Sequence, residues 1–396
     1  MIAPEPFFEP RGTPFSEFHR IRALTDLGHT VDLVTYPFGR DVTMPGLRIF
    51  RCLRPPYLTH AKIGPSLAKI PLDTLLTVTA VRLALTRRYD AVHSHEEGAF
   101  IGLGLAALLR IPHLYDMHSS LPQQLTNFAF SRSTLLRRLF AAGERLLIRG
   151  SRVIIVICPH LAETVREVDP HARMVLIENA PGPTDPPVDP EAVSRLRGEL
   201  GLTPATPVIL YTGTLEAYQG LDLLLESMVP VRQARPDARL VLAGGKPDQV
   251  EALRAAARAG GVEEVVIFAG QRPAGEIPAL LETAAVLVSP RSRGTNTPLK
   301  IYQYLRSGRP IVATRLLTHL QVLDDEVAVL TKPTAEDFAR GILAVLQGDP
   351  QVGGVGERAR RLAETKYTYE AYLERTREAC RSLVPPIPGE LAKDPA

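Results

Sequence analysis

A run of cations and small polar residues, Arg291–Lys300, follows an apolar strand near the middle of the second half of the chain. We expect that strand at Val286–Ser289 and a helix over Pro298–Ser307 at the end of the run. Thr297 suits the N-cap of this helix and Pro298 its first position. A helix start offers free backbone amides and the positive end of the helix dipole, and both favour an anion.

The charge of this segment supports the same interpretation. It contains Arg291, Arg293 and Lys300 and no acidic residue. Lys300 would lie in the first helical turn, where a positive side chain is unfavourable unless an anion is bound. A solvated basic helix start is the alternative, but three cations with a cap and no local acid favour a phosphate or diphosphate site.

Two loops that contain glycine also follow expected strands. The first, Phe8–Pro14, comes after a strand limited to Met1–Ala3, which is short for a central parallel strand, so the strand is truncated or the true start lies upstream. Gly12 lets the backbone approach a ligand at the end of that strand, although one glycine without a G-x-G-x-x-G pattern also fits an ordinary turn. The second loop, Tyr211–Gly220, is either a ligand-binding loop or an ordinary strand-to-helix turn.

Histidines and carboxylates gather at two expected strand ends of the first half. His93 and His95 end one strand, and His113, Asp116 and His118 follow along the next. Two histidines and a carboxylate suffice for a metal site, but a His-x-His pair directs both rings to one side only if the strand continues. The sequence Glu96-Glu97-Gly98 that follows argues against a continuing strand. We expect no metal, a substrate-facing role for His118 and a structural role for His113.

The chain alternates short β-branched runs with amphipathic segments, which is typical of α/β domains with parallel sheets. The expected strands are Val31–Thr35, Leu47–Arg51, Ala91–His93, His113–Asp116, Val153–Ile157, Met174–Ile177, Val208–Tyr211, Arg239–Ala243, Val265–Phe268, Val286–Ser289, Ile311–Ala313 and Val327–Leu330. The expected helices are Phe15–Leu27, Leu72–Arg87, Ala99–Leu109, Ser133–Arg149, Leu221–Val231, Gln249–Arg258, Pro298–Ser307 and Ala335–Leu346.

A proline-rich stretch divides the two halves. Residues 181–192 are interpreted as a stiff linker, because five prolines in ten residues prevent a strand or a helix. We predict one Rossmann-like domain over residues 1–180, a second over 193–366, a C-terminal helix over 367–384 that packs back on the first domain, and a disordered tail over 385–396. Two doubly wound domains would face a central cleft, with ligands at the carboxyl ends of the strands.

The charges are distributed unevenly along the sequence. The formal net charge is +3, too small for a protein whose whole surface binds nucleic acid. Residues 42–72 and 283–323 contain eleven cations and no acid, which leaves 35 basic and 43 acidic residues elsewhere. We interpret the second stretch as the phosphate site. The first is either a surface for an anionic acceptor or membrane, or a loop with incidental arginines. The basic, amphipathic residues 132–149 are interpreted as a packed helix.

Cysteines and long apolar runs are scarce. Cys52, Cys158 and Cys380 are too few and too far apart for a disulfide framework or a Cys-x-x-Cys metal site. We expect no signal peptide, since the N-terminus lacks a charged segment followed by an apolar one. The longest apolar run, Gly98–Leu109, has 12 residues, whereas a bilayer requires roughly 20. We expect a cytoplasmic protein that contacts the inner face of the cell membrane peripherally or not at all.

These segments, in this order, resemble glycosyltransferase family 4 (glycosyl transferases group 1), the retaining nucleotide-sugar enzymes with the two-domain GT-B fold. The resemblance extends from Ile2 to about Leu383, and the block from Pro298 to Ala313 is its most specific part. It is carried by Arg11–Thr13, Leu27–Val31, Asp90–His95, Tyr115–His118, Tyr211–Thr214, Leu242–Gly245, Pro298–Tyr304 and Gly308–Ala313.

The resemblance implies transfer of a sugar from a UDP- or GDP-sugar to a saccharide or lipid-linked acceptor in envelope polysaccharide or glycolipid synthesis. His118 matches the family's histidine near the donor sugar. Gln303 and Thr295 stand where the family has its ribose-binding and sugar-contacting glutamates, and Thr214 and Gln219 replace its Arg and Lys phosphate clamp. Gln303 can still hydrogen-bond ribose, and the cations of the second basic stretch can replace the clamp.

The expected site therefore has two groups of residues. Catalytic roles fall to His118, Lys300 and Arg293. Donor contacts fall to Gly12, Thr13, Gly213, Thr214, Gln219, Arg272, Arg291, Thr295, Asn296, Thr297, Pro298, Leu299 and Gln303. No cofactor, metal or nucleic acid is expected, since the sequence has no Asp-x-Asp pair and cations with helix amides can stabilise a leaving phosphate that takes the acceptor proton itself. The departures leave two alternatives, a sugar-nucleotide epimerase or hydrolase and a non-catalytic nucleotide-sugar-binding protein.

Overall fold

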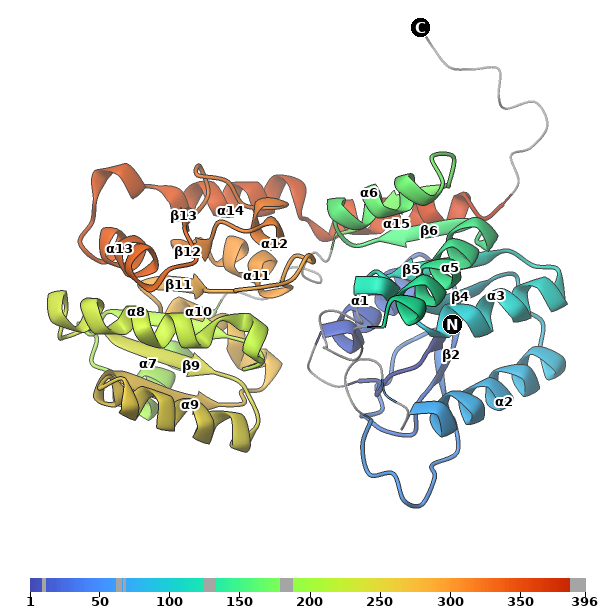
Figure 1. Cartoon of the computed structure of the whole chain (residues 1–396), viewed down its shortest axis with the longest axis horizontal. Coiled ribbons are helices and arrows are strands. Elements are labelled where there is room, and N and C mark those ends of the chain that lie inside the picture. Colours follow the sequence, from blue (N-terminus) through green and yellow to red (C-terminus); the bar gives the residue numbers. More distant parts are fainter. Residues whose placement is uncertain (9–11, 62–65, 67–68, 124–132, 179–187, 385–396) are drawn as a thin grey trace, which may run out of the picture. The chain divides into compact units, whose positions relative to one another are not determined.

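A computed structural model of the chain describes all residues except 9–11, 62–65, 67–68, 124–132, 179–187 and 385–396. The chain forms two compact units, one of Met1–Asn179 with Glu370–Ala396 and one of Ala180–Tyr369. Each unit is built on one parallel sheet and is described by itself (Figure 1).

The first unit contains a seven-stranded parallel sheet in the order β3-β2-β1-β4-β5-β6-β7. Its strands are β1 (Ile2–Ala3), β2 (Val31–Thr35), β3 (Leu47–Arg51), β4 (Val92–His95), β5 (His113–Met117), β6 (Val153–Val156) and β7 (Met174–Leu176). The helices described in this unit are α1 (Gly12–Asp26), α2 (Ile70–Thr86), α3 (Gly98–Leu109), α5 (Thr134–Gly150), α6 (Pro159–Val168) and α15 (Tyr369–Arg381).

The first strand has only two residues and yet lies at the centre of the sheet. Ile2 pairs with Val34 of β2 and with Ser94 of β4. Pro4 follows, and proline has no backbone N–H to donate to a strand ladder. The strand order reverses between β1 and β4, and the carboxyl ends of strands at such a point are where doubly wound sheets bind ligands.

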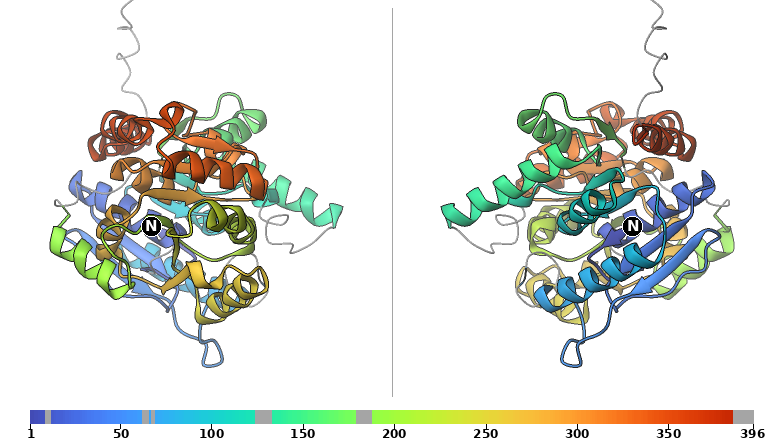
Figure 2. Two further views of the ribbon diagram at one scale, coloured as in Figure 1. Left: turned by 90° about the vertical axis from the view of Figure 1, so that its left-hand side faces the viewer. Right: turned by 90° about the vertical axis from the view of Figure 1, so that its right-hand side faces the viewer.

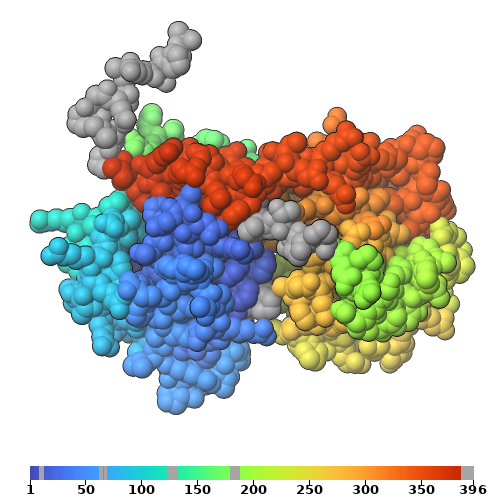
Figure 3. Space-filling model, turned by 180° about the vertical axis from the view of Figure 1, so that it is seen from behind, coloured from blue at the N-terminus to red at the C-terminus, as the bar shows by residue number. Residues whose placement is uncertain are grey.

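Helix α15 returns the end of the chain to the first unit. The Nη1 atom of Arg20 in α1 donates to Oγ1 of Thr376 at 3.3 Å, and the guanidinium lies 4.9 Å from the centre of the Tyr372 ring. Arg375 donates to the carbonyl oxygen of Leu176 at 3.1 Å. Figure 3 shows this red C-terminal segment lying along the blue N-terminal part of the unit. The helix therefore belongs to the first unit although it follows the second in sequence.

The second unit contains a six-stranded parallel sheet in the order β10-β9-β8-β11-β12-β13. Its strands are β8 (Val208–Thr212), β9 (Arg239–Ala243), β10 (Val266–Gly270), β11 (Val286–Ser289), β12 (Ile311–Thr314) and β13 (Val329–Thr331). Its α-helices are α7 (Pro190–Glu199), α8 (Leu221–Ala234), α9 (Pro247–Ala259), α10 (Ile277–Glu282), α11 (Lys300–Ser307), α12 (Leu317–Leu320), α13 (Ala335–Leu346) and α14 (Val355–Lys366).

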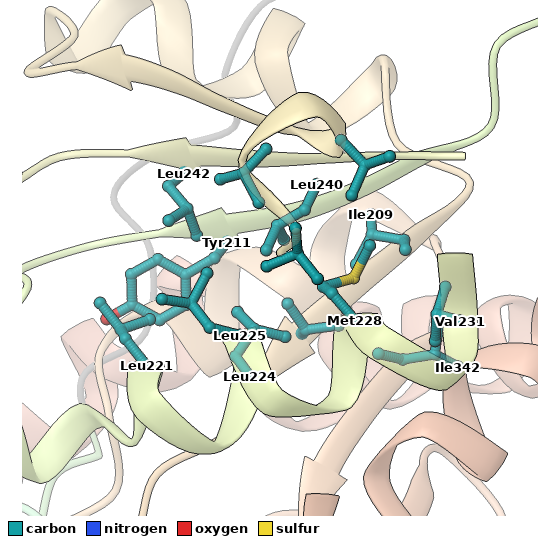
Figure 4. Packing of buried hydrophobic residues seen from close by; sticks show 14 of the residues in the cluster. Ile209, Tyr211, Leu221, Leu224, Leu225, Met228, Val231, Leu240, Leu242 and Ile342 are labelled. Carbon is teal, nitrogen blue, oxygen red and sulfur yellow. The ribbon is translucent and has the colours of Figure 1, made fainter. Parts of the chain in front are cut away.

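A continuous apolar core holds this second sheet against its helices. Leu224 and Met228 of α8 pack against Ile209 and Leu240 of the sheet (Figure 4). The ring of Tyr211 belongs to the same cluster, while its hydroxyl lies at the cluster's margin. Tyr211, the second-last residue of β8, is thus anchored in the core just before the loop that leads toward α8.

The prediction of two doubly wound parallel sheets is confirmed. Every expected strand is present with ends that differ by at most two residues, because buried parallel strands are continuous apolar runs that the sequence marks clearly. Five of the described helices, α6, α7, α10, α12 and α14, were not predicted. No helix in the described part of the chain is long and apolar enough to cross a membrane.

The predicted linker extends too far at its C-terminal end. Helix α7 begins at Pro190, because the Asp189 side chain accepts a hydrogen bond from the backbone N–H of Glu191 at 2.9 Å and proline suits a first helical position. Residues 181–187 of the linker and the tail over 385–396 lie outside the described residues.

Candidate functional site

A buried, unpaired cation begins α11 in the second unit. The Lys300 side chain is only 9% exposed, and its Nζ atom lies 3.6 Å from the centre of the Tyr211 ring. In the part of the chain that the structure describes, this Nζ has no hydrogen-bond acceptor. Burial, and then the charge of Arg291, hold the pKa of Lys300 well below its ordinary value. Burying a charge without a counter-ion is costly, and an anion bound here would remove that cost.

Arg291 adds a second cation beside it. Its Nη1 atom donates to the carbonyl oxygen of Asn296 at 2.8 Å and to Oγ1 of Thr318 at 3.1 Å, and its guanidinium lies 5.1 Å from the centre of the Tyr218 ring. Its Nε atom is buried and unpartnered, and burial lowers its pKa. No carboxylate among the described residues forms an ion pair with Arg291 or Lys300, so their charges are compensated only by neutral dipoles and rings.

The loop between Arg291 and Lys300 is tied to the structure around it by its carbonyl groups. Thr314 of β12 donates from its hydroxyl to the carbonyl of Arg291 at 2.6 Å, and Thr318 of α12 donates to that of Asn296 at 2.6 Å. Gln321 donates to the carbonyl of Thr295 at 2.7 Å. These bonds fix the backbone of the loop, so a ligand would meet a preformed surface.

Helix α11 begins two residues later than predicted. Pro298 and Leu299 form a tighter turn, in which the N–H of Ile301 bonds to the Pro298 carbonyl at 3.0 Å and that of Tyr302 to the Leu299 carbonyl at 3.3 Å. Thr297 is therefore not the N-cap, which corrects the sequence prediction. Its hydroxyl is buried and has no partner among the described groups, so it is available to donate to a ligand.

The loop after β8 lies against the same cations. A side chain at Gly213 would place its Cβ atom 3.5 Å from Nζ of Lys300, and the residue has φ +135°, which favours glycine. Gln219 donates to Oγ1 of Thr214 at 3.3 Å, and its own amide oxygen is buried without a partner. Tyr211 donates to the Thr214 carbonyl at 2.6 Å. The structure thus brings together the loop Tyr211–Gly220 and the segment Arg291–Lys300, which the sequence had singled out separately.

Three other predicted site residues, one expected to be catalytic and two to bind the donor, are placed differently. Arg293 is exposed, and Gln303 is partly buried in α11. Arg272 lies after β10, where its Nη1 atom is 3.0 Å from a carboxylate oxygen of Glu199 and 3.5 Å from one of Glu276. No described contact brings Arg272 to Lys300, and its charge is already compensated.

His319 is a site residue that sequence reasoning missed. Its Nδ1 atom lies 2.7 Å from the carbonyl oxygen of Thr314, which requires a proton on Nδ1, and its Nε2 atom accepts from the Ser289 hydroxyl at 2.8 Å. Burial lowers its pKa to about 3, with smaller effects from Arg291 and Lys300. The ring is therefore neutral and ties β11 to β12 beneath the loop. The sequence feature that could have indicated His319 is the acid-free stretch 283–323, which contains it.

In the first unit, a buried network surrounds His118. Its Nε2 atom lies 3.2 Å from Oδ1 of Asp116 and 3.2 Å from Nδ1 of His95. Arg20 donates to the other oxygen of Asp116 at 2.9 Å, and His93 lies 3.2 Å from the same oxygen. Burial opposes ionisation of Asp116, but Arg20 and His118 outweigh it and hold its pKa well below the ordinary value. Burial of His118 by itself would lower its pKa. The nearby Asp116 carboxylate outweighs this effect, so the pKa of His118 is raised.

His93, His95 and Asp116 also have the spacing of a metal site, since one ligand atom from each lies within 4.8 Å of the others. The Asp116 oxygen nearest to both histidines already binds the guanidinium of Arg20. A cation at that point would be repelled by Arg20. This donor set therefore fits an internal ion-pair network better than a metal.

A pair of carboxyl groups lies beside this network. Glu17 of α1 is fully buried near Glu5, and burial together with the Glu5 charge raises the pKa of Glu17 well above its ordinary value. Burial also raises the pKa of Glu96 to about 8, and the Ser119 hydroxyl donates to Glu96 at 2.9 Å. Both carboxyl groups therefore hold their protons to higher pH than an ordinary glutamate does. Gly12 and Thr13 form the first turn of the same helix, and the residues before them lie outside the described part.

The first basic stretch, residues 42–72, is largely neutralised by acids outside it or at its edge. Arg48 lies 2.6 Å from Asp32, and Arg51 lies 2.9 Å from Asp41. Lys69 lies 2.6 Å from a carboxylate oxygen of Glu97. Lys62 lies outside the described residues. The charges of these three side chains are therefore already compensated by carboxylates within the protein.

Two family models match the chain, one over each unit. "Glycosyl transferase 4-like domain" matches residues 19–180, and "Glycosyl transferases group 1" matches residues 206–348. The chain belongs to the group 1 glycosyltransferases. The cations Arg291 and Lys300 thus lie in one matched part of the chain, and the network around His118 lies in the other.

Named relatives of this glycosyltransferase match part of their length. D-inositol 3-phosphate glycosyltransferase of Corynebacterium aurimucosum is 26% identical over 284 residues, 68% of this chain and 66% of that protein. GDP-mannose-dependent alpha-(1-6)-phosphatidylinositol monomannoside mannosyltransferase of Mycolicibacterium smegmatis is 31% identical over 170 residues, 41% of this chain and 44% of that protein. The chain thus spans just under two thirds of the length of the first relative.

Solved structures show the fold of this glycosyltransferase. Anabaena HepE in complex with UDP and glucose superposes with a TM-score of 0.74 at 17% identity, covering 96% of this chain and 99% of that chain. At 17% identity this similarity is evidence for the fold alone, and it confirms the predicted GT-B fold class.

Proposed function

We propose that this glycosyltransferase moves a sugar from a nucleoside-diphosphate sugar to an acceptor hydroxyl with retention of anomeric configuration. The observation that supports the proposal is a pair of cations, buried Lys300 and partly buried Arg291, at the carboxyl ends of β8 and β11 with no described carboxylate partner. A diphosphate carries the two or more negative charges that would compensate both. The free hydroxyl of Thr297 and the space left by Gly213 suit the same ligand.

The proposed chemistry uses these groups as stabilisers of the leaving group. When the bond between the anomeric carbon and the terminal phosphate oxygen breaks, negative charge grows on the diphosphate. Lys300 and Arg291, fixed in a poorly solvated position, would stabilise that charge without rearranging. The acceptor oxygen forms its bond to the anomeric carbon on the same face, and its proton passes to the departing phosphate oxygen. No metal is required in this scheme, because the cations balance the charge.

Names of relatives suggest the substrates. One is described as GDP-mannose-dependent and acts on a phosphatidylinositol mannoside, one acts on inositol 3-phosphate, and the HepE structure holds UDP and glucose. We propose a UDP- or GDP-sugar donor and a phosphorylated polyol or lipid-linked acceptor in glycolipid synthesis. Gln303 would hydrogen-bond the donor ribose through its amide, and His118 would donate a hydrogen bond to the transferred sugar.

A transfer assay tests this proposal. The purified chain is incubated with UDP- and GDP-sugars and with inositol phosphate or phosphatidylinositol, with and without a chelator, and proton NMR reports the anomeric configuration of the product. We expect a retained glycoside and unchanged activity with the chelator. Net hydrolysis or epimerisation of the donor as the main turnover would contradict transfer, as would diphosphate binding without any turnover.

A further inference from the structure

The guanidinium of Arg291 is enclosed by groups from three segments of the second unit. Its Nη1 atom donates to the carbonyl oxygen of Asn296 at 2.8 Å, and its central carbon lies 5.1 Å from the centre of the Tyr218 ring. A side chain at Gly294 would place its Cβ atom 3.0 Å from Nη2 of Arg291, so the loop itself packs against the group. A further contact comes from Thr318, which lies outside the loop. The guanidinium is therefore held in one orientation without a ligand.

The hydroxyl of Thr318 makes two contacts at this point. It accepts from Nη1 of Arg291 at 3.1 Å and donates to the Asn296 carbonyl at 2.6 Å. That carbonyl also accepts from Nη1, so the three groups bond to one another in a closed ring. A hydroxyl has one proton, and here it is directed at Asn296, which leaves the lone pairs of the oxygen to face the guanidinium. Thr318 is fully buried, so the ring is shielded from water.

The residue after Thr318 fixes its place in the fold. Both residues belong to α12, and the ring of His319 lies 2.7 Å from the Thr314 carbonyl oxygen through Nδ1 and 2.8 Å from the Ser289 hydroxyl through Nε2. Ser289 and Thr314 are the last residues of β11 and β12. The Thr314 hydroxyl in turn donates to the Arg291 carbonyl at 2.6 Å. The two strand ends thus hold α12 and the loop of Arg291 in one arrangement.

These contacts orient Arg291 without neutralising it. Its described partners are a hydroxyl, a carbonyl and an aromatic ring, and none of them carries a charge. Its Nε atom has no acceptor among the described residues, so part of its hydrogen-bonding capacity is unused. A buried arginine with a structural role is usually paired with a carboxylate, as Arg20 is with Asp116. Orientation by neutral groups instead preserves the positive charge for an anion.

We propose that Thr318 is a positioning residue for the donor diphosphate and that it acts through Arg291. An arginine side chain has several rotatable bonds, and ordering it on binding costs free energy, so a guanidinium that is fixed beforehand binds its ligand more tightly. The Thr318 hydroxyl would supply this order without contacting the donor itself. The proposal rests on the proposed function, because it requires that Arg291 meets the diphosphate.

A double-mutant cycle tests this role, with isothermal titration calorimetry of the full chain against UDP and against GDP. T318V keeps the shape of the side chain and removes the hydroxyl, and R291Q removes the guanidinium. We expect the Kd of the nucleotide that the wild type binds to rise about tenfold in T318V and at least as much in R291Q. In the double variant the Kd should equal that of R291Q alone, because the hydroxyl then has no guanidinium to hold. T318S keeps the hydroxyl and should bind within about twofold of the wild type.

The matched control is T283V in the same unit. Thr283 is buried, and its hydroxyl donates to the Leu280 carbonyl at 2.6 Å before β11 begins, at the opposite end of that strand from Arg291. T283V should lower the urea midpoint of unfolding about as much as T318V does and leave the Kd unchanged. Neither threonine lies in α8, α9 or α13, which pack side by side over the sheet (Figure 2), so circular dichroism should show both variants folded.

Additive effects of T318V and R291Q on the Kd would overturn the proposal, and so would a T318V chain that binds as tightly as the wild type. A T283V chain that loses affinity as T318V does would overturn it as well. T318A, which removes the hydroxyl with a smaller side chain, takes the place of T318V in the cycle if that variant does not fold. A wild type that binds neither nucleotide would overturn the proposed function too, whereas wild-type binding with additive effects overturns the role of Thr318 alone.

Discussion

The two units bury charge in opposite ways. In the first, Arg20 donates to Asp116, which in turn lies beside His118, so positive and negative groups compensate one another inside the protein. In the second, Lys300 and Arg291 lie together with no described carboxylate partner. Because an isolated buried charge is costly, the first arrangement stabilises the fold by itself, whereas the second becomes favourable only when a ligand supplies the negative charge. The comparison distinguishes a network whose charges compensate one another from a pair of cations at which we propose that a ligand binds.

The largest expected effect comes from breaking the compensated network. Arg20→Met leaves Asp116 buried without its guanidinium partner and removes the contacts of Arg20 with α15. We expect the free energy of unfolding to fall by about 3–5 kcal/mol, measured by urea denaturation. Adding Asp116→Asn to Arg20→Met should recover part of the loss. Equal stability of Arg20→Met and wild type would show that the pair is not a structural element.

The corresponding change in the second unit should behave in the opposite way. Lys300→Met removes an unpaired buried cation, so the ligand-free protein should unfold at the same or a higher urea concentration. Binding of UDP or GDP should weaken by about 1–3 kcal/mol in isothermal titration calorimetry, because a charge-assisted contact to phosphate is lost. Lys332→Met, an exposed lysine of the same unit, is the control and should change neither quantity. Unchanged affinity in Lys300→Met would remove Lys300 from the site.

Proton linkage gives a third, smaller effect. The pKa of Lys300 is held well below its ordinary value in the free protein, and a bound diphosphate should raise it. The contribution of Lys300 to affinity is therefore complete below its free-state pKa and declines as pH rises through that pKa. Calorimetry in buffers of different ionisation enthalpy should show proton uptake on binding in the wild type and less uptake in Lys300→Met. Identical proton uptake in both proteins would contradict this.

The smallest effect concerns His118. Its folded-state pKa is raised above the ordinary 6.5 by Asp116, so it contributes stability that is fully present below pH 6.5 and is lost as pH rises through the folded-state value. We expect the free energy of unfolding, measured by urea denaturation, to fall over that interval. His118→Gln should lack this interval of pH dependence. A wild-type profile parallel to that of the variant would mean that Asp116 does not raise the pKa of His118.

Much of the fold could be predicted from the sequence, because its elements are marked locally. The strands Arg239–Ala243 and Val286–Ser289 are apolar runs apart from one polar residue at an end, and the structure places them at the predicted bounds. The start of α11 could not be predicted in the same way. Thr297 and Pro298 are good capping residues, yet the tight turn at Pro298–Leu299 delays the helix to Lys300. Capping preferences are weak enough for tertiary contacts of the loop to override them.

The candidate site was recognised in part. The cations of 291–300 were visible as an acid-free run, and the resemblance to a family indicated Thr214 and Gln219. His319 and Arg20 were missed, because each acts through partners that other strands and helices bring to it. The exposed leucines of α5 were assigned to a packed helix, since a 3.6-residue period identifies apolar positions but does not say which of them find a protein partner.

The sequence by itself determined where the positive charge lies along the chain, in two acid-free stretches of a body that is otherwise mildly acidic. Only the tertiary structure decided which of these cations remain uncompensated. Arg48 and Lys69 meet acids 16 and 28 residues away, while Lys300 and Arg291 meet no described acid. Coulomb energy depends on distance in space and on burial, and neither follows from sequence spacing. The distribution of charge therefore indicated a binding site only after the structure had shown which cations have acidic partners and which do not.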